Sequence, residues 1–125
     1  RGKVAVMFTG EPPSEDPAFF KGKALTYYGR WTYKYEEATR RGAVAVFIIH
    51  TTPTASYGWP VVRGFSREEP QVRRAAGAPA LAFGGWLTTD AAERVFARKV
   101  DDLLAAANKK ESQPFALATR LRGDV

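Results

Sequence analysis

The 125-residue chain contains no cysteine and only one histidine. It can therefore form no disulfide and no thiolate zinc site, and a single imidazole cannot supply the two or three histidines of most catalytic zinc sites. Long hydrophobic runs are also absent. The longest, AVAVFII at residues 43–49, is far shorter than the roughly 20 residues that cross a bilayer. We therefore predict no metal site, no thiol chemistry and no membrane span.

The remaining composition is that of a globular protein. Hydrophobic residues make up 45% of the chain and charged residues 26%, which argues against extensive disorder. The length corresponds to one domain, so we predict a single domain over residues 1–125. A strand-like run at residues 4–8 begins almost at once and no initiator methionine precedes it. We therefore expect the chain to be excised from a larger protein.

The first half of the chain has the pattern of a βαβ unit. Residues 4–8 and 43–49 predict strands, and the second is apolar throughout, as in a strand buried on both faces of a parallel sheet. Between them, Thr32 has the properties of a helix N-cap and Gly42 those of a left-handed helix stop. Strand, crossover helix and central strand together predict an α/β fold.

The second half predicts one more buried strand and a capped helix. Residues 80–83 form the strand, and Gly84 and Gly85 predict the turn into a helix capped by Thr88 or Thr89.

A polar loop at residues 50–60 and a charged turn at residues 66–74 connect these elements. A second helical pattern begins at Val100, and alternation over residues 115–121 predicts a last edge strand with one wet face. Together the elements predict an α/β fold: a mixed sheet with a βαβ unit, flanked by two or three helices.

His50 is the one side chain whose unperturbed pKa lies near neutral pH, and it follows the predicted central strand, at the edge where ligands gather in open α/β sheets. The sequence contains no motif that would place a nucleophile or a carboxylate partner beside His50. A strand-end histidine that makes a backbone hydrogen bond is the simpler interpretation. We predict no catalytic residue in this chain.

The segment TYYGRWTYKY at residues 26–35 is rich in aromatic residues. Trp31 and Tyr35 belong with Ala38 to the inner stripe of the predicted helix. Other aromatic and basic residues fall in loops, where no helical pattern requires them. Because Tyr, Trp and Arg are enriched at interface hot spots, we expect these residues to line a recess or contact a partner: Tyr27, Tyr28, Arg30, His50, Tyr57 and Trp59.

The 19 Lys and Arg residues against 13 Asp and Glu give a net charge of +6. The basic pairs at residues 40–41, 73–74 and 109–110 are dispersed, and no nucleic-acid-binding signature is present. We therefore expect no nucleic-acid partner, and nucleic-acid binding is the weakest of the functions considered.

Three segments carry a resemblance to a known module: RGKVAVMFTGEPP, FKGKALTYYGRWTYKYEEATRRGAVAVFIIHTTPTASYGWPVV and APALAFGGWLTTDAAERVF. In this order they are similar to the protease-associated (PA) domain inserted into secreted zinc-dependent exopeptidases of the aminopeptidase type. The most specific elements are the GKV strand start, the YKYEEATRRGAVAVFIIH helix and strand, and the GGWLTTDAAERVF turn and helix.

The resemblance implies a mixed sheet flanked by helices, no catalysis by this chain and no cofactor in it, with zinc only in the peptidase domain of the parent protein. It implies a lid, gating or interaction element beside the peptidase active site. The partners would be that catalytic domain and its peptide or protein substrate, at an extracytoplasmic (secreted or periplasmic) location. The residues themselves leave open a free-standing module that binds peptides or anions in the recess.

Overall fold

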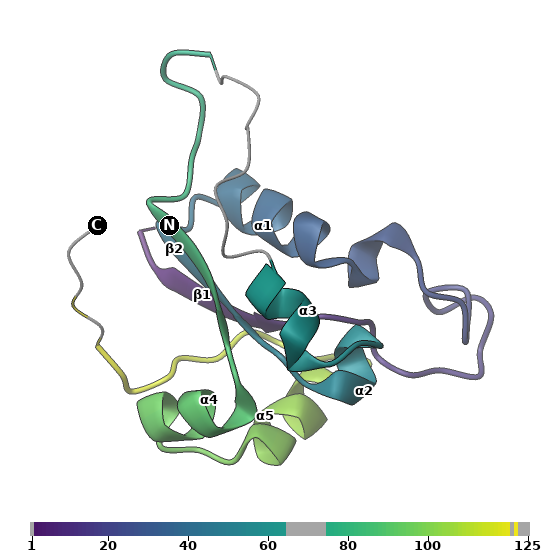
Figure 1. Ribbon diagram of the computed structural model, residues 1–125. Coiled ribbons are helices and arrows are strands. Elements are labelled where there is room, and N and C mark those ends of the chain that lie inside the picture. The colour runs from purple at the N-terminus through teal and green to yellow at the C-terminus, as the bar shows by residue number, and fades with distance from the viewer. Residues whose placement is uncertain (1, 65–74, 121, 123–125) are drawn as a thin grey trace.

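A computed structural model describes residues 2–64, 75–120 and 122. The charged turn predicted at residues 66–74 lies outside these ranges. At the centre of the fold are three parallel strands in the spatial order β1 (Val4–Phe8), β2 (Ala45–Ile49) and β3 (Phe83–Leu87) (Figure 1).

The central strand β2 is the most buried part of the sheet. Val46, Ile48 and Ile49 are each 0% exposed, as expected for an uninterrupted apolar strand between two neighbours. The register aligns Val4 with Ala45 and Ala45 with Phe83. Both strand pairs in the described part of the chain are parallel, so the α/β class is confirmed there, whereas the predicted mixed sheet is wrong for these strands.

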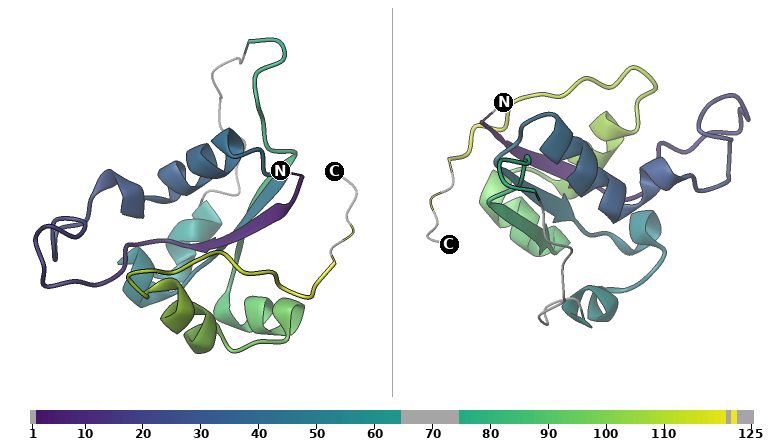
Figure 2. Two further views of the ribbon diagram at one scale, coloured as in Figure 1. Left: turned by 180° about the vertical axis from the view of Figure 1, so that it is seen from behind. Right: turned by 90° about the horizontal axis from the view of Figure 1, so that it is seen from above.

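Helix α1 (Trp31–Arg40) covers one face of the sheet (Figures 1 and 2). It packs against Val46 and Ile48 through the predicted inner stripe of Trp31, Tyr35 and Ala38. This contact buries one face of β2 and confirms the interpretation of Trp31 and Tyr35 as core residues.

The ends of α1 differ slightly from the prediction. Arg30, with extended backbone, occupies the N-cap position, so the helix begins at Trp31, one residue before the predicted cap Thr32. Gly42 has a φ of +77°, the left-handed conformation expected of a residue that ends a helix.

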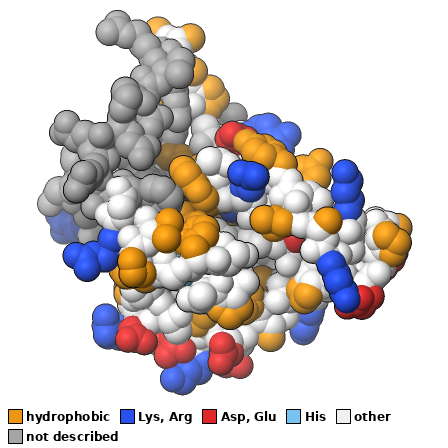
Figure 3. All heavy atoms as spheres, turned by 45° about the vertical axis from the view of Figure 1, so that its right-hand side comes forward, with side chains coloured by type: hydrophobic (Ala, Val, Ile, Leu, Met, Phe, Trp, Pro, Cys, Tyr) orange, Lys and Arg blue, Asp and Glu red, His pale blue; other side chains and the backbone are white. Residues whose placement is uncertain are grey.

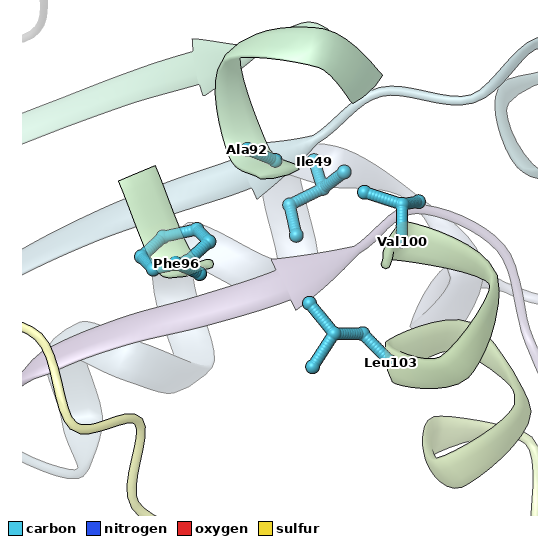
Figure 4. Close-up of a cluster of buried hydrophobic side chains, with 5 residues drawn as sticks. All are labelled: Ile49, Ala92, Phe96, Val100 and Leu103. Carbon is cyan, nitrogen blue, oxygen red and sulfur yellow. The ribbon is translucent and has the colours of Figure 1, made fainter. Parts of the chain in front are cut away.

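Helices α4 (Thr89–Phe96) and α5 (Val100–Ala107) cover the opposite face. Figure 4 shows how side chains from β2, α4 and α5 point toward one another there: Ile49, Ala92, Phe96, Val100 and Leu103. The predicted helix start at Val100 is confirmed. The sheet is therefore the middle of three layers, with a separate apolar cluster on each face.

The third strand lies later in the chain than predicted. Gly84 and Gly85 are interior residues of β3, not a turn, and the strand ends at Leu87. The prediction of a strand at residues 80–83 followed by a glycine turn is wrong. Thr88 is the N-cap of α4, as one of the two predicted alternatives had it.

Two further helices and the chain end also differ from the prediction. Helices α2 (Thr52–Ala55) and α3 (Trp59–Gly64) occupy the region expected to be a loop and a short segment, so the described residues contain five α-helices instead of two or three. The last strand, predicted at residues 115–121, is not formed over 115–120, and Leu121 lies outside the described ranges. Leu117 instead packs against the α4–α5 cluster.

Candidate functional site

The segments that follow β2 and β3 enclose an open hollow of about 360 Å³ at the carboxyl edge of the sheet. This is the edge at which open α/β sheets bind ligands. Figure 1 shows α2 and α3 at this end of β2 and the start of α4 below them. The lining comes from the β2–α2 junction, the start of α3 and the β3–α4 junction: His50, Thr51, Thr52, Pro53, Trp59, Thr88, Thr89 and Asp90.

His50 is fixed in this wall by its backbone and by its ring. The residue is only 5% exposed, and its backbone N–H donates to the carbonyl of Leu87 at 2.8 Å. The ring nitrogen Nε2 lies 2.9 Å from the carbonyl oxygen of Tyr57. Because a carbonyl only accepts, Nε2 must carry the hydrogen and donate it. The interpretation of His50 as a strand-end residue with a backbone hydrogen bond is confirmed.

Aromatic rings surround His50. The ring centroids of Tyr57, Trp59 and Trp86 lie 5.8, 5.6 and 6.3 Å from that of the imidazole. Burial raises the pKa of Tyr57, whose hydroxyl is enclosed and has no hydrogen-bond partner among the described residues. This part of the site is therefore closely packed and largely aromatic.

The threonines around the hollow hold the backbone in place. Thr51 accepts a hydrogen bond from the Thr54 N–H at 3.3 Å, and Thr88 accepts one from Ala91 at 3.2 Å, so each caps a helix. Thr89 donates to the carbonyl of His50 at 3.4 Å and links the two strand ends. The hydroxyls of Thr51, Thr88 and Thr89 thus form hydrogen bonds with the backbone that surrounds the hollow.

Asp90 is the only carboxylate among the described residues that line the hollow, and it is exposed. The sequence pattern placed Thr88, Thr89 and Asp90 at a helix start but not at a site. They were missed because β3 was predicted to end too early. Their position directly after a strand that is parallel to β2 could have predicted that they lie beside His50, because parallel strands end at the same edge of a sheet.

The six predicted contact residues do not form one recess. His50 and Trp59 line the hollow and Tyr57 contacts His50. The other three lie on or after the 3₁₀ turn η1 (Tyr27–Gly29), and none of them lines the hollow: Tyr27, Tyr28 and Arg30.

The η1 group forms a surface of its own. Tyr27 and Tyr28 are 50% and 51% exposed, and their rings contact Tyr33 at centroid distances of 5.7 and 5.0 Å. The Tyr27 hydroxyl donates to Glu36 at 2.7 Å, and this bond raises the pKa of Tyr27. Arg30 is exposed beside them.

The segment that follows β1 lies between the two groups. Thr9 and Thr54 share a hydrogen bond of 3.2 Å on the side of α2. One residue later, Gly10 donates its N–H to the carbonyl of Gly29 at 2.8 Å, and Glu11 accepts from the N–H of Thr26 at 3.1 Å. The hollow and the η1 surface are therefore separated by well-bonded backbone.

Charged side chains form no continuous patch on the face shown in Figure 3. Lys and Arg side chains lie both at the outline and within this face, and Asp and Glu side chains lie among them, most of them along the lower edge. Within residues 2–64, 75–120 and 122, no cluster of three or more His, Asp or Glu side chains is suitable for a metal ion. No helix in the same part of the chain is long and apolar enough to span a membrane.

Comparison with known proteins adds no assignment, because no family model, no curated protein and no solved structure matches this chain.

Proposed function

We propose that this chain is a non-catalytic module similar to the PA domains of zinc exopeptidases of the aminopeptidase type. In this proposal it binds a peptide or protein segment in the hollow at the carboxyl edge of the sheet. It would thereby shape the access of substrate to the peptidase domain of an extracytoplasmic parent protein. The observation that carries the proposal is the hollow itself, formed where the connections after β2 and β3 leave the sheet.

The bonds of the lining residues support binding over acid–base chemistry. The Nε2 hydrogen of His50 is donated to a backbone carbonyl, and the residue is buried. The hydroxyls of Thr51, Thr88 and Thr89 are bonded to the surrounding backbone. Nucleophilic catalysis instead requires a hydroxyl in contact with a base that is free to take its proton.

The size of the hollow also favours a short stretch of peptide. Small-ligand pockets commonly measure about 300–1,000 Å³, and this one measures about 360 Å³. Trp59 and Pro53 supply apolar lining, and Thr52 and Asp90 supply exposed polar groups. The alternative of a free-standing peptide-binding module would use the same hollow, and the coding sequence on either side of the chain distinguishes the two.

Amide NMR titration of the chain with a panel of short peptides tests the binding site. We expect shifts in residues 50–53 and 88–90 and at Trp59, with the amides of Tyr27 and Tyr28 unchanged. A panel that leaves all the hollow residues unshifted contradicts the proposed function.

The non-catalytic part has a separate test. Incubation of the chain with zinc and a chromogenic aminoacyl substrate should give only background hydrolysis. Sustained turnover that scales with protein concentration would overturn this part of the proposal.

A further inference from the structure

We infer that the hollow binds the positively charged amino group of its ligand, with the Asp90 carboxylate as counter-ion and the Trp59 ring beside it. This inference rests on the proposed function, because it names the part of the peptide that the hollow receives. The shared chemistry is a primary ammonium group, supplied either by a peptide amino terminus or by a lysine side chain.

The charge around the hollow is the first argument. Asp90 is exposed, and neither an ion pair nor a hydrogen bond of its carboxylate is present within the described part of the chain. No Lys or Arg is found among the described lining residues. Asp90 is thus the only charged side chain in the described lining, so this lining has a formal charge of −1 in a chain of net charge +6. An ammonium ligand would neutralise that carboxylate and gain a charge-assisted hydrogen bond.

The indole of Trp59 is the second argument. Trp binds cations over its ring face more strongly than Tyr or Phe does. Trp59 is held by an edge-to-face contact with His50 at 5.6 Å, and His50 is in turn fixed by its bond to Tyr57. The ring is therefore positioned before a ligand arrives, which lowers the entropy cost of binding.

An anionic ligand fits this site less well. The dipole of α4 favours negative charge at its start, but Asp90, the second residue of that helix, already provides it. A carboxylate or phosphate bound there would face the Asp90 charge directly. The same charge attracts an ammonium group.

Asp90 also has a purely structural explanation, because an acidic residue in the first turn stabilises a helix. The chain contains a matched control for this role. Asp101 is the second residue of α5, as Asp90 is of α4, and it does not line the hollow. Asp90→Asn and Asp101→Asn therefore remove the same helix interaction, but only Asp90→Asn removes charge from the hollow.

The test compares three short peptides on the whole chain by calorimetry and amide NMR. The first is trialanine amide with a free amino terminus, and the second is its N-acetylated form. The third is acetylated and carries a central lysine. We expect the free amine to bind about tenfold more tightly than the acetylated form. The lysine peptide shows whether a side-chain ammonium serves as well as a terminal one.

The variants complete the test. Asp90→Asn should remove the preference for the free amine, Asp90→Glu should restore most of it, and Asp101→Asn should leave it unchanged. Equal affinity of the wild-type chain for all three peptides overturns the inference while the proposed function stands. Failure of every peptide to bind overturns the proposed function and the inference together. A preference for ammonium that survives in Asp90→Asn also overturns the role of Asp90.

Discussion

Gly84 is the position at which the packing of the fold can be tested most directly. It lies inside β3, and its φ is not in the left-handed region, so the backbone does not require glycine there. A Cβ atom at this position would instead lie 3.0 Å from Cε1 of Tyr35 on the helix above. We predict that Gly84→Val destabilises the protein because its added methyl groups press on that ring.

The magnitude follows from how firmly Tyr35 is held. Its ring contacts Trp31 at a centroid distance of 5.8 Å, and its hydroxyl lies 3.5 Å from the carbonyl oxygen of Gly85. Overpacking of this kind costs about 1–3 kcal/mol. The loss of glycine flexibility in the unfolded chain offsets about 0.4–1 kcal/mol of it. The net cost should therefore be about 1–2 kcal/mol, or a fall of roughly 3–10 °C in Tm.

A double-mutant cycle isolates the contact. Urea unfolding followed by tryptophan fluorescence should show that Tyr35→Ala and Gly84→Val together cost at least about 1 kcal/mol less than the sum of the single variants. Gly58→Val is the control, since a Cβ there meets only Pro60 at an ordinary 3.5 Å. It should be additive with Tyr35→Ala. Additivity of Gly84→Val with Tyr35→Ala would refute the reasoning.

Three further predictions concern helix ends and ionisation. A hydrogen bond from the backbone N–H of Val100 lowers the pKa of Glu93 below its ordinary 4.5, so the stability that Glu93 contributes is present above that pH and lost on acidification. In urea titrations, the destabilisation caused by Glu93→Gln should therefore shrink as the pH falls. A difference that stays constant with pH would contradict this. Thr88→Ala removes the cap bond to Ala91 and should cost about 0.5–2 kcal/mol, whereas Thr88→Ser should cost little. Burial raises the pKa of Tyr35 from 10.0 to about 12, so the free energy of unfolding should fall as the pH rises between these values. In urea unfolding measured over this pH range, Tyr35→Phe should show a smaller fall than the wild-type chain.

Local sequence was sufficient wherever an element's own pattern decides its structure. The uninterrupted apolar run that ends at Ile49 predicted the central strand, because a strand covered on both faces of a sheet has apolar side chains at successive positions. Val46, Ile48 and Ile49 are buried accordingly. A cap at Thr88 or Thr89 was predicted, and Thr88 is the one that forms it, with its hydroxyl three residues before the Ala91 N–H from which it accepts. In these cases the residues that decide the structure lie within the element itself or a few residues away in the chain.

Prediction failed where a distant side chain decides. Gly84 and Gly85 have low strand propensity and resemble a turn, but Tyr35 occupies the space that a side chain at residue 84 would need. The alternation over residues 115–121 likewise had another cause. Leu117 packs against the core and the Thr119 hydroxyl donates to the carbonyl of Val95 at 3.3 Å, so these two residues contact the fold without a strand partner, whereas Phe115 is 49% exposed.

The predicted contact residues were expected to line one recess, and the structure divides them into two groups; the physical reason lies in the segment after β1. Gly10 has a φ of +81°, and a Cβ there would lie 2.9 Å from the carbonyl oxygen of Thr54. Only glycine fits, and its N–H reaches the carbonyl of Gly29 on the other side. Because this backbone lies between α2 and η1, the hollow includes His50 and Trp59 but not Tyr27. The exposed η1 tyrosines therefore form a second surface, separate from the hollow, so substitution of Tyr27 should leave the proposed peptide binding in the hollow unchanged.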